Sequence, residues 1–285
     1  MGLFDDIDRL TETEKIVRAP FGYPGSKRKS IRHLLPLLPY REKYIEVFGG
    51  SGVVMLNRKR SKLDVYNDRF GGVVCFYRCI KDAKKLEKLC ELLQCTIYAR
   101  EEYQHCRDTW QNTEDEIERA AKWYYSVVYS FGSKGRTWGR ITGSNGGLAG
   151  RIQSVLPAFQ TIHDRLQHVQ IENRSWELLL KEYDSDDAVF YLDPPYCDTD
   201  RAGYHHGMKA DDHRDMLNTI MSMKGFVAIS GFANSLYDGF DWDNRHTWDT
   251  ICTMSGNSNT EGNNKEHLKG LEKYGEVEEV LWVKE

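Results

Sequence analysis

The sequence predicts an α/β protein with a doubly wound sheet and an inserted helical subdomain. Three observations lead to this prediction. An apolar strand at residues 44–48 runs into a glycine-rich turn at 49–52, and a second apolar strand at 188–192 runs into Asp-Pro-Pro-Tyr at 193–196. Between these two units, the segment 96–160 breaks the alternation of helix and strand. The length of 285 residues suits one large domain that carries an insertion.

Composition and charge exclude several classes of protein. Hydrophobic residues make up 40% of the chain and charged residues 29%, which is typical of a globular protein and excludes a wholly disordered one. No apolar run approaches the roughly 18 residues of a membrane-spanning helix, and the acidic start predicts no secretory signal. The net charge of −4 excludes a uniformly basic coat for nucleic acid but allows a local basic groove.

The cysteines indicate a reduced protein of the cytoplasm. There are seven, an odd number, and no two form a CxxC pair. Cys75 and Cys79 are four residues apart and are expected on one face of a helix. This pattern favours free thiols and predicts neither structural zinc nor another metal site.

Helix-like and strand-like segments alternate along the first 95 residues, after a polar start of about a dozen residues that is expected to be a loose arm. An apolar strand, a glycine-rich turn, a helix and a second strand in this order are the usual beginning of a doubly wound sheet. The expected elements are a turn-rich loop at 21–27, a helix at 29–38, strands at 44–48 and 63–68, and helices at 53–56 and 73–93.

The middle and the end of the chain complete the organisation. The insert begins with helices, one of which holds Trp123-Tyr124-Tyr125, and continues into a glycine-rich, basic segment at 131–151. The regions 1–95 and 161–285 are expected to form one domain around the insert at 96–160. The elements expected after the insert are strands at 169–172, 188–192 and 226–230, a helix at 211–223, a loop at 255–265 and a closing edge strand at 277–283.

Asp193-Pro194-Pro195-Tyr196 is the motif that indicates chemistry. The two prolines stiffen the turn and remove two amide donors, so main-chain carbonyls there are free to accept hydrogen bonds from a ligand. Asp193 adds a carboxylate acceptor and Tyr196 adds a flat ring. Two acceptors beside a stacking surface suit a planar amino group on an aromatic ring. The alternative interpretation is a strand-ending loop with an incidental aromatic residue.

The glycine-rich turn is a weaker signal. Its glycines let the backbone approach a ligand closely, but the turn is neither GxGxxG nor a phosphate loop with Lys-Ser/Thr. Asp68, at the end of the next strand, stands where an acidic residue can hold ribose hydroxyls. These features favour a nucleoside-containing cofactor over a pyrophosphate. Taken alone, an ordinary structural turn remains the alternative.

These residues together resemble the Dam-like D12 class of DNA adenine-N6 methyltransferases. Four segments match in order: Phe21-Gly22-Tyr23-Pro24-Gly25-Ser26-Lys27, then residues 44–52, then Asn67-Asp68, then the motif at 193–196. The resemblance implies a Rossmann-like S-adenosylmethionine-dependent methyltransferase fold with a seven-stranded mixed sheet. It also implies that 1–95 and 161–285 are parts of the catalytic domain and that 96–160 is the target-recognition insert.

The resemblance further implies a reaction and a set of site residues. S-adenosylmethionine would donate a methyl group to N6 of a flipped-out adenine in double-stranded DNA and leave as S-adenosylhomocysteine. The implied catalytic residues are Asp193, Pro194, Pro195 and Tyr196. The implied cofactor-binding residues are Tyr23, Lys27, Glu46, Phe48, Gly49, Gly50, Ser51, Gly52, Asn67, Asp68, Trp176 and Asp193. We expect a cytoplasmic monomer of a bacterium or a phage host, acting alone or as two molecules on a DNA site, and a place in restriction-modification.

The basic segment of the insert is the expected DNA-binding surface. Glycines and aromatic residues accompany its charge, and arginine can bind guanine edges while aromatic rings can enter between bases. The expected DNA-binding residues are Lys134, Arg136, Trp138, Arg140 and Arg151. Runs of charge elsewhere, such as 27–32 and 58–62, are more often solvated faces.

Alternative functions follow from the same motifs. The same Asp-Pro-Pro-Tyr motif also serves base methyltransferases of RNA that act on guanine N2, and a DNA-binding homologue without catalysis is a nonenzymatic alternative. A dehydrogenase is disfavoured because the dinucleotide fingerprint is missing. His213-Arg214-Asp215 echoes a kinase triplet without the other kinase motifs, so a kinase is rejected.

Overall fold

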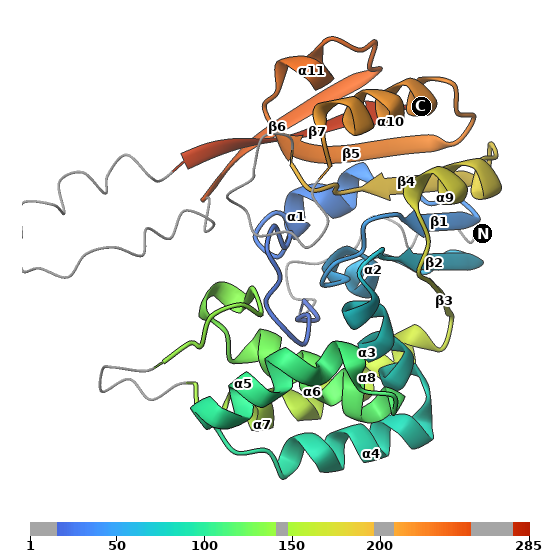
Figure 1. The fold of residues 1–285 in the computed structure, drawn as a ribbon. Coiled ribbons are helices and arrows are strands. Elements are labelled where there is room, and N and C mark those ends of the chain that lie inside the picture. The colour runs from blue at the N-terminus through green and yellow to red at the C-terminus, as the bar shows by residue number, and fades with distance from the viewer. Residues whose placement is uncertain (1–15, 141–147, 197–207, 252–275) are drawn as a thin grey trace, which may run out of the picture.

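The computed structural model describes residues 16–140, 148–196, 208–251 and 276–285, which form a seven-stranded sheet with helices around it (Figure 1). The strand order is β3-β2-β1-β4-β5-β7-β6. The strands are β1 Lys43–Glu46, β2 Leu63–Asn67, β3 Val169–Glu172, β4 Ala188–Leu192, β5 Phe226–Phe232, β6 Asn244–Ile251 and β7 Glu276–Lys284. The expected arm at the N-terminus and the expected loop at 255–265 lie outside the described residues.

The sheet is mixed, as predicted. Strands β1 to β5 pair in parallel, whereas β7 runs antiparallel to both β5 and β6. All five residues of β4 are buried, which explains why its sequence is a continuous apolar run. The α/β fold class with a seven-stranded mixed sheet is therefore confirmed.

Helices flank the sheet and form a separate layer beyond its β3 edge. The helices near the sheet are α1 Ile31–Leu34, α2 Val53–Asn57, α3 Gly71–Lys81, α9 Trp176–Tyr183, α10 Ala210–Met221 and α11 Ser235–Asp238. The layer at the bottom of Figure 1 contains α4 Ala83–Gln94, α5 Arg100–Thr109, α6 Glu116–Val128, α7 Arg151–Val155 and α8 Phe159–Leu166. No helix of the described residues is long and apolar enough to cross a membrane.

Two local predictions were wrong. The helix expected at 73–93 is two helices, because Asp82 has extended backbone angles (φ −88°, ψ 119°) and its carboxylate accepts the amides of Lys84 and Lys85 as the N-cap of α4. The strand expected at the edge, β7, lies between β5 and β6. The outermost strand is β6, which the sequence did not indicate because it is polar along most of its length.

A seam of aromatic side chains joins the sheet domain to the helical layer. Phe76 of α3 stacks on Tyr124 of α6 with ring centroids 4.7 Å apart and an angle of 4° between the planes. The aromatic seam consists of Phe21, Phe76, Trp123, Tyr124 and Phe159. It belongs to one continuous hydrophobic core that reaches from the sheet into α6. The insert therefore has no separate core in the described residues, although its sequence interrupts the sheet.

Candidate active site

The two motifs meet at one edge of the sheet. Strands β1 and β4 pair in parallel with Ile45 opposite Phe190 and Glu46 opposite Tyr191. Because the carboxyl ends of parallel neighbours lie at the same edge, the glycine-rich turn after β1 and Asp-Pro-Pro-Tyr after β4 come together. This edge is where doubly wound sheets bind their ligands.

The glycine-rich turn is tightly confined by side chains behind it. A Cβ atom at Gly49 would lie 2.1 Å from a ring carbon of Tyr66, and Gly50 has a positive φ of 49°. The Gly50 amide donates to Oδ2 of Asp68 at 2.8 Å, and its carbonyl accepts from the Tyr66 hydroxyl at 2.7 Å. Hydrogen bonds therefore hold both the amide and the carbonyl of Gly50 in place. The backbone of the turn borders the cavity without a side chain.

A first cavity lies between this turn, the N-terminal loop and the end of β4. The sequence-predicted cofactor residues that line it are Tyr23, Lys27, Glu46, Phe48, Gly49, Gly50, Ser51, Asp68, Trp176 and Asp193. Phe70, which the sequence did not single out, also lines it, two residues beyond Asp68. The cavity combines a glycine backbone, carboxyl groups and aromatic rings.

Two of the predicted cofactor residues, Gly52 and Asn67, do not line this cavity. The side-chain amide of Asn67 donates to the carbonyl of Val47 at 2.8 Å, and its oxygen accepts the Arg174 amide at 2.8 Å. Gly52 has a φ of 64°, and its amide donates to the carbonyl of Gly49 at 2.8 Å. Both residues hold the turn in shape from behind the cavity.

Burial changes the acidity of two carboxyl groups at this cavity. Burial raises the pKa of Glu46 to about 8, although the Tyr44 hydroxyl donates a 2.8 Å hydrogen bond to it. Burial also raises the pKa of Asp68 to about 6, against the stabilising hydrogen bonds from the amides of Phe70 and Gly50. At neutral pH, Glu46 is therefore largely protonated, whereas Asp68 is largely ionised.

A second cavity lies on the other side of the N-terminal loop. Its wall includes the rings of Tyr196 and Phe232, whose centroids are 4.5 Å apart. Cationic side chains from two parts of the chain also line it: Arg18, Arg28, Lys29 and Arg151. Both cavities share Tyr23, Gly25, Ser26 and Lys27. The loop that carries these residues is thus the partition between the two cavities.

The ammonium group of Lys27 is buried at the centre of this partition. Its Nζ atom lies 2.6 Å from Oδ1 of Asp193, 2.6 Å from the hydroxyl of Tyr196 and 3.1 Å from Oε1 of Glu279. Oδ1 of Asp193 also accepts the Ser230 hydroxyl at 3.1 Å. The predicted catalytic residues Asp193 and Tyr196 therefore share one lysine, and the sequence did not indicate Glu279 as a third partner.

The charges in this cluster shift one another's pKa values. Burial opposes the charge of Lys27, but the combined coulombic effects of Asp193, Tyr196, Tyr191 and Glu279 outweigh it and raise the pKa of the ammonium well above its usual value. Burial raises the pKa of Asp193 to about 6, and the neighbouring ammonium of Lys27 limits this rise. At pH 7 or above, the site contains an ionised carboxylate and a protonated lysine.

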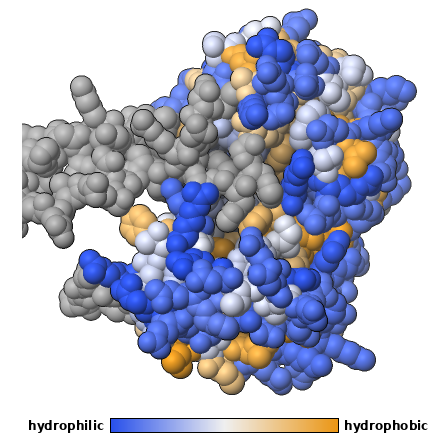
Figure 2. Space-filling view, viewed as in Figure 1, coloured by the Kyte–Doolittle hydropathy of each residue, from blue (hydrophilic) through white to orange (hydrophobic). Residues whose placement is uncertain are grey.

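The predicted DNA-binding residues occupy two places. Lys134, Arg136 and Arg140 lie on the loop after α6, whereas Arg151 begins α7 and lines the second cavity. The ring of Trp138 is half-buried and stacks on Tyr98, with centroids 4.5 Å apart. Most of the coloured surface in Figure 2 is hydrophilic, with scattered hydrophobic patches. Trp138 therefore packs within the insert, whereas Arg136 and Arg140 are exposed.

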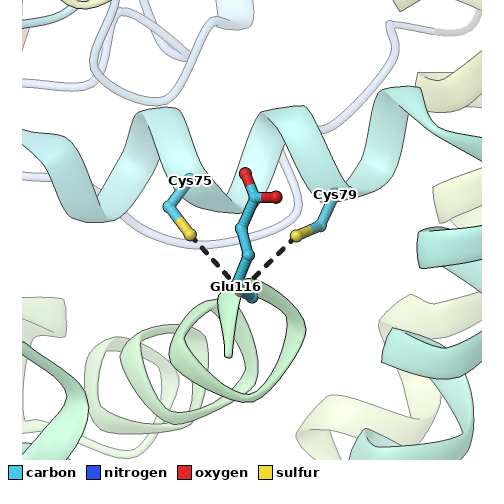
Figure 3. A group of neighbouring side chains, drawn as sticks. All are labelled: Cys75, Cys79 and Glu116. Carbon is cyan, nitrogen blue, oxygen red and sulfur yellow. Dashed lines mark hydrogen bonds between the residues drawn. The ribbon is translucent and has the colours of Figure 1, made fainter. Parts of the chain in front are cut away.

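The predicted helix face with Cys75 and Cys79 packs against the start of α6 (Figure 3). Both thiols donate to the main-chain carbonyl of Glu116, at 3.4 Å and 3.6 Å, and the Glu116 carboxylate pairs with Lys85. The neighbouring Cys79 thiol lowers the pKa of Cys75 to about 7 against the effect of burial, with Arg119 as a further cause. The two sulfur atoms and a carboxylate oxygen of Glu116, which could in principle bind a metal ion, lie within 4.8 Å of one another. Since each group already has a protein partner, the cluster is explained as part of the α3–α6 contact.

Comparisons with known proteins add independent findings. The model of the family described as D12 class N6 adenine-specific DNA methyltransferase matches residues 23–251. Modification methylase LlaI of Lactococcus lactis subsp. lactis is 26% identical over 213 residues, which cover 70% of this chain and 32% of that protein. The chain thus spans about a third of the length of this curated relative. The rRNA methyltransferase aviRa from Streptomyces viridochromogenes superposes with a TM-score of 0.38 and 10% identity over 92% of this chain and 85% of that chain.

Proposed function

This chain belongs to the D12 class of N6 adenine-specific DNA methyltransferases, and on that basis we propose that it transfers a methyl group from S-adenosylmethionine to N6 of adenine in duplex DNA. The observation that carries the proposal is the position of Asp193 and Tyr196. Asp193 lines the first cavity and Tyr196 lines the second, and both contact Lys27 on the partition between them. A donor in one cavity and a base in the other would meet at Asp-Pro-Pro-Tyr.

The first cavity suits S-adenosylmethionine, which supplies a methyl group made electrophilic by its sulfonium centre. The backbone of Gly50 borders the cavity without a side chain, and a Cβ atom there would lie 3.0 Å from the ring of Tyr23, which lines the same cavity. The carboxylate of Asp68 is an acceptor for ribose hydroxyls. The rings of Phe70 and Trp176 offer apolar surface for the adenine ring. The protonated carboxyl group of Glu46 avoids a third buried negative charge beside Asp68 and Asp193.

The second cavity suits a base that has left the duplex. Tyr196 offers a stacking face, and base–aromatic stacking is worth about 1–3 kcal/mol per base. Phe232 adjoins it, and cations such as Arg28, Lys29 and Arg151 provide positive charge for phosphates near the cavity. Taking the base out of the stack is necessary because N6 is otherwise paired within the duplex. This cavity is therefore the proposed site of the target adenine.

Asp193 and the carbonyl of Pro194 would accept the two hydrogens of the target amine. The lone pair of an exocyclic amine is delocalised into the ring, which makes the nitrogen a poor nucleophile. Two acceptors favour the pyramidal nitrogen that exists mainly in the transition state, so they stabilise that state more than the ground state. Alignment of the reacting groups contributes much of the remaining rate enhancement.

Asp193 need not act as a strong base. The nitrogen becomes acidic only when it carries the new methyl group, so a carboxylate with a pKa of about 6 is sufficient to receive the proton. Lys27 keeps this carboxylate in place and Ser230 donates a hydrogen bond to it. Asp193 is thus a hydrogen-bond acceptor at the end of β4 whose position Lys27 fixes.

The insert would bind the duplex around the extruded base. Lys134, Arg136, Arg140 and Arg151 are the proposed contacts to phosphates and base edges, and S-adenosylhomocysteine is the proposed product. The test of the whole proposal is the transfer of tritiated methyl groups from S-adenosylmethionine to duplex DNA, followed by identification of the modified nucleoside. Label in N6-methyladenine is the expected result. Transfer to ribosomal RNA and not to DNA would favour the RNA alternative.

A further inference from the structure

A buried glutamate on β7 shares the lysine of the catalytic motif. Glu279 is 4% exposed, and its Oε1 lies 3.1 Å from Nζ of Lys27, the same atom that lies 2.6 Å from Asp193. The other oxygen, Oε2, accepts the hydroxyl of Ser30 at 2.8 Å. One ammonium group therefore lies between two carboxylates that come from different strands.

Burying the carboxylate of Glu279 is unfavourable for the stability of the fold. The residues that follow it on β7, Val280, Leu281 and Trp282, are buried and apolar. A buried carboxylate in such surroundings loses its hydration and is tolerated only when it is paired and hydrogen-bonded. Glu279 has both kinds of partner, in Lys27 and Ser30, and it lines the second cavity beside Tyr196 and Phe232. This placement connects it with the proposed base site.

The proposed reaction creates a conflict at Asp193. Its Oδ1 already accepts hydrogen bonds from Lys27 and Ser230, so the target amine would share the carboxylate with a buried ammonium group. The amine also gains positive charge as it takes the methyl group, and an ammonium on Asp193 would repel that charge. A shift of the lysine away from Asp193 would relieve this repulsion, provided that the ammonium remains paired, because an unpaired buried ammonium is unfavourable.

We propose that Glu279 is a positioning residue that takes over the Lys27 ammonium when the target amine binds to Asp193. The inference rests on the proposed function, since it concerns the amine acceptor of that reaction. A small displacement of Nζ is sufficient, because Glu279 already lies within ion-pair distance. Ser30, in the same N-terminal segment as Lys27, holds the receiving carboxylate in place.

Several charged and titratable groups surround this transfer and must be considered in any pH experiment. Lys27 comes from the N-terminal loop, Glu46 from β1, Tyr191 from β4, Tyr196 from the segment after β4 and Glu279 from β7. Among these groups, Lys27 lowers and Glu279 raises the pKa of Asp193. Removing the charge of Glu279 therefore removes its repulsion of the Asp193 carboxylate and leaves Asp193 as the sole carboxylate partner of the Lys27 ammonium among these groups.

The first test is a double-mutant cycle of Glu279→Gln and Lys27→Gln. Single-turnover methylation at saturating donor and DNA is expected to fall about tenfold in Glu279→Gln, with Glu279→Asp recovering part of the loss. Donor affinity, measured by titration calorimetry, is expected to stay within about twofold of the wild-type value. In the Lys27→Gln background, Glu279→Gln should cause no further loss. A wild-type rate in Glu279→Gln, or an equal loss in both backgrounds, would overturn the inference.

The second test does not depend on methyl transfer. The titration of Asp193 can be followed by NMR of protein labelled with 13C at the aspartate carboxyl carbon, and Asp193→Asn assigns the resonance. The pKa of Asp193 should be lower in Glu279→Gln than in the wild type. The matched control is Glu278→Gln, at the preceding, exposed position of β7, which should leave that pKa unchanged. An unchanged pKa in Glu279→Gln would refute the sharing of Lys27, whereas absence of methylation in the wild-type protein would refute only the proposed function.

Discussion

The ring of Tyr23 lies directly against the backbone of Gly50, so that a Cβ atom at Gly50 would come within 3.0 Å of ring carbon Cδ1. This contact brings the N-terminal loop and the turn after β1 together at the first cavity. Gly50 also has a φ of 49°, which disfavours any residue with a side chain. The contact therefore depends on glycine for two separate reasons.

Gly50→Ala should weaken the binding of S-adenosylmethionine. The strained backbone alone costs about 1 kcal/mol, and displacement of Tyr23 should bring the loss of affinity to about tenfold or more. Titration calorimetry with the donor measures this loss. Gly150→Ala is the matched control, because a Cβ atom at Gly150 meets nothing within 4 Å. Equal donor affinities of the two variants would contradict the placement of the donor in the first cavity.

The rate of methyl transfer should rise with pH through about 6. The pKa of Asp193 is about 6, and only the ionised carboxylate is a full acceptor for the target amine, so protonation below that pH should remove activity. The measurement is the single-turnover rate at saturating donor, which excludes the effect of Asp68 on donor binding. Asp193→Asn should be slow at every pH and show no such rise. A rise that persists in Asp193→Asn would have to come from another group.

Glu46→Gln should flatten the pH dependence of folding stability. The folded-state pKa of Glu46 is about 8, above the usual value of 4.5, so between these values the unfolded chain releases a proton that the folded protein retains. The free energy of unfolding therefore falls as pH rises through this window, by at most about 1.4 kcal/mol per pH unit from this group. Urea unfolding at about pH 5.5 and about pH 7.5 measures the difference in the free energy of unfolding.

The control for this experiment is Glu42→Gln, at an exposed carboxyl group that pairs with Lys62. It should leave the wild-type pH dependence in place. If Glu46→Gln and the wild type lost the same stability between the two pH values, Glu46 would be ionised in the folded protein, and the protonated state assigned to the first cavity would be wrong.

Arg136→Ala and Arg140→Ala should weaken DNA binding more than donor binding. If each arginine contacts a phosphate, its removal should also reduce the slope of log K against log salt by about 0.9. Fluorescence anisotropy with labelled duplex at several salt concentrations measures both effects. Lys88→Ala, at an exposed lysine of α4, is the control and should change neither. Equal losses of DNA and donor affinity would argue against a separate recognition surface.

The sequence was most informative where chemistry depends on neighbouring residues. Asp193-Pro194-Pro195-Tyr196 and the turn at 49–52 are short motifs, and both lie at the predicted edge of the sheet because parallel strands end there together. The sequence also contained a signal for the break at Asp82, because aspartate is a strong N-cap residue. The apolar periodicity on both sides nevertheless favoured one continuous helix.

The remaining site residues depend on contacts between distant parts of the chain. Glu279 accepts a hydrogen bond from Ser30, 249 residues earlier, and it reaches the site because β7 pairs with β5, where Glu279 stands opposite Phe232. Asn67 shows the opposite case: it stands beside Asp68 in a motif, yet its side chain bonds to Val47 and Arg174 behind the cavity.

The aromatic seam has a consequence for the construction of chimeras with new target specificity. Phe21 is the first residue of the loop that carries Lys27, and it packs edge-on against Trp123 of the insert. The Tyr124 hydroxyl donates to the carbonyl of Pro20 at 2.9 Å. A foreign insert would replace Trp123 and Tyr124 and so remove their contacts with the loop that carries Lys27. Grafts that keep these two residues and exchange only the loop bearing Lys134, Arg136 and Arg140 should preserve the geometry around Asp193.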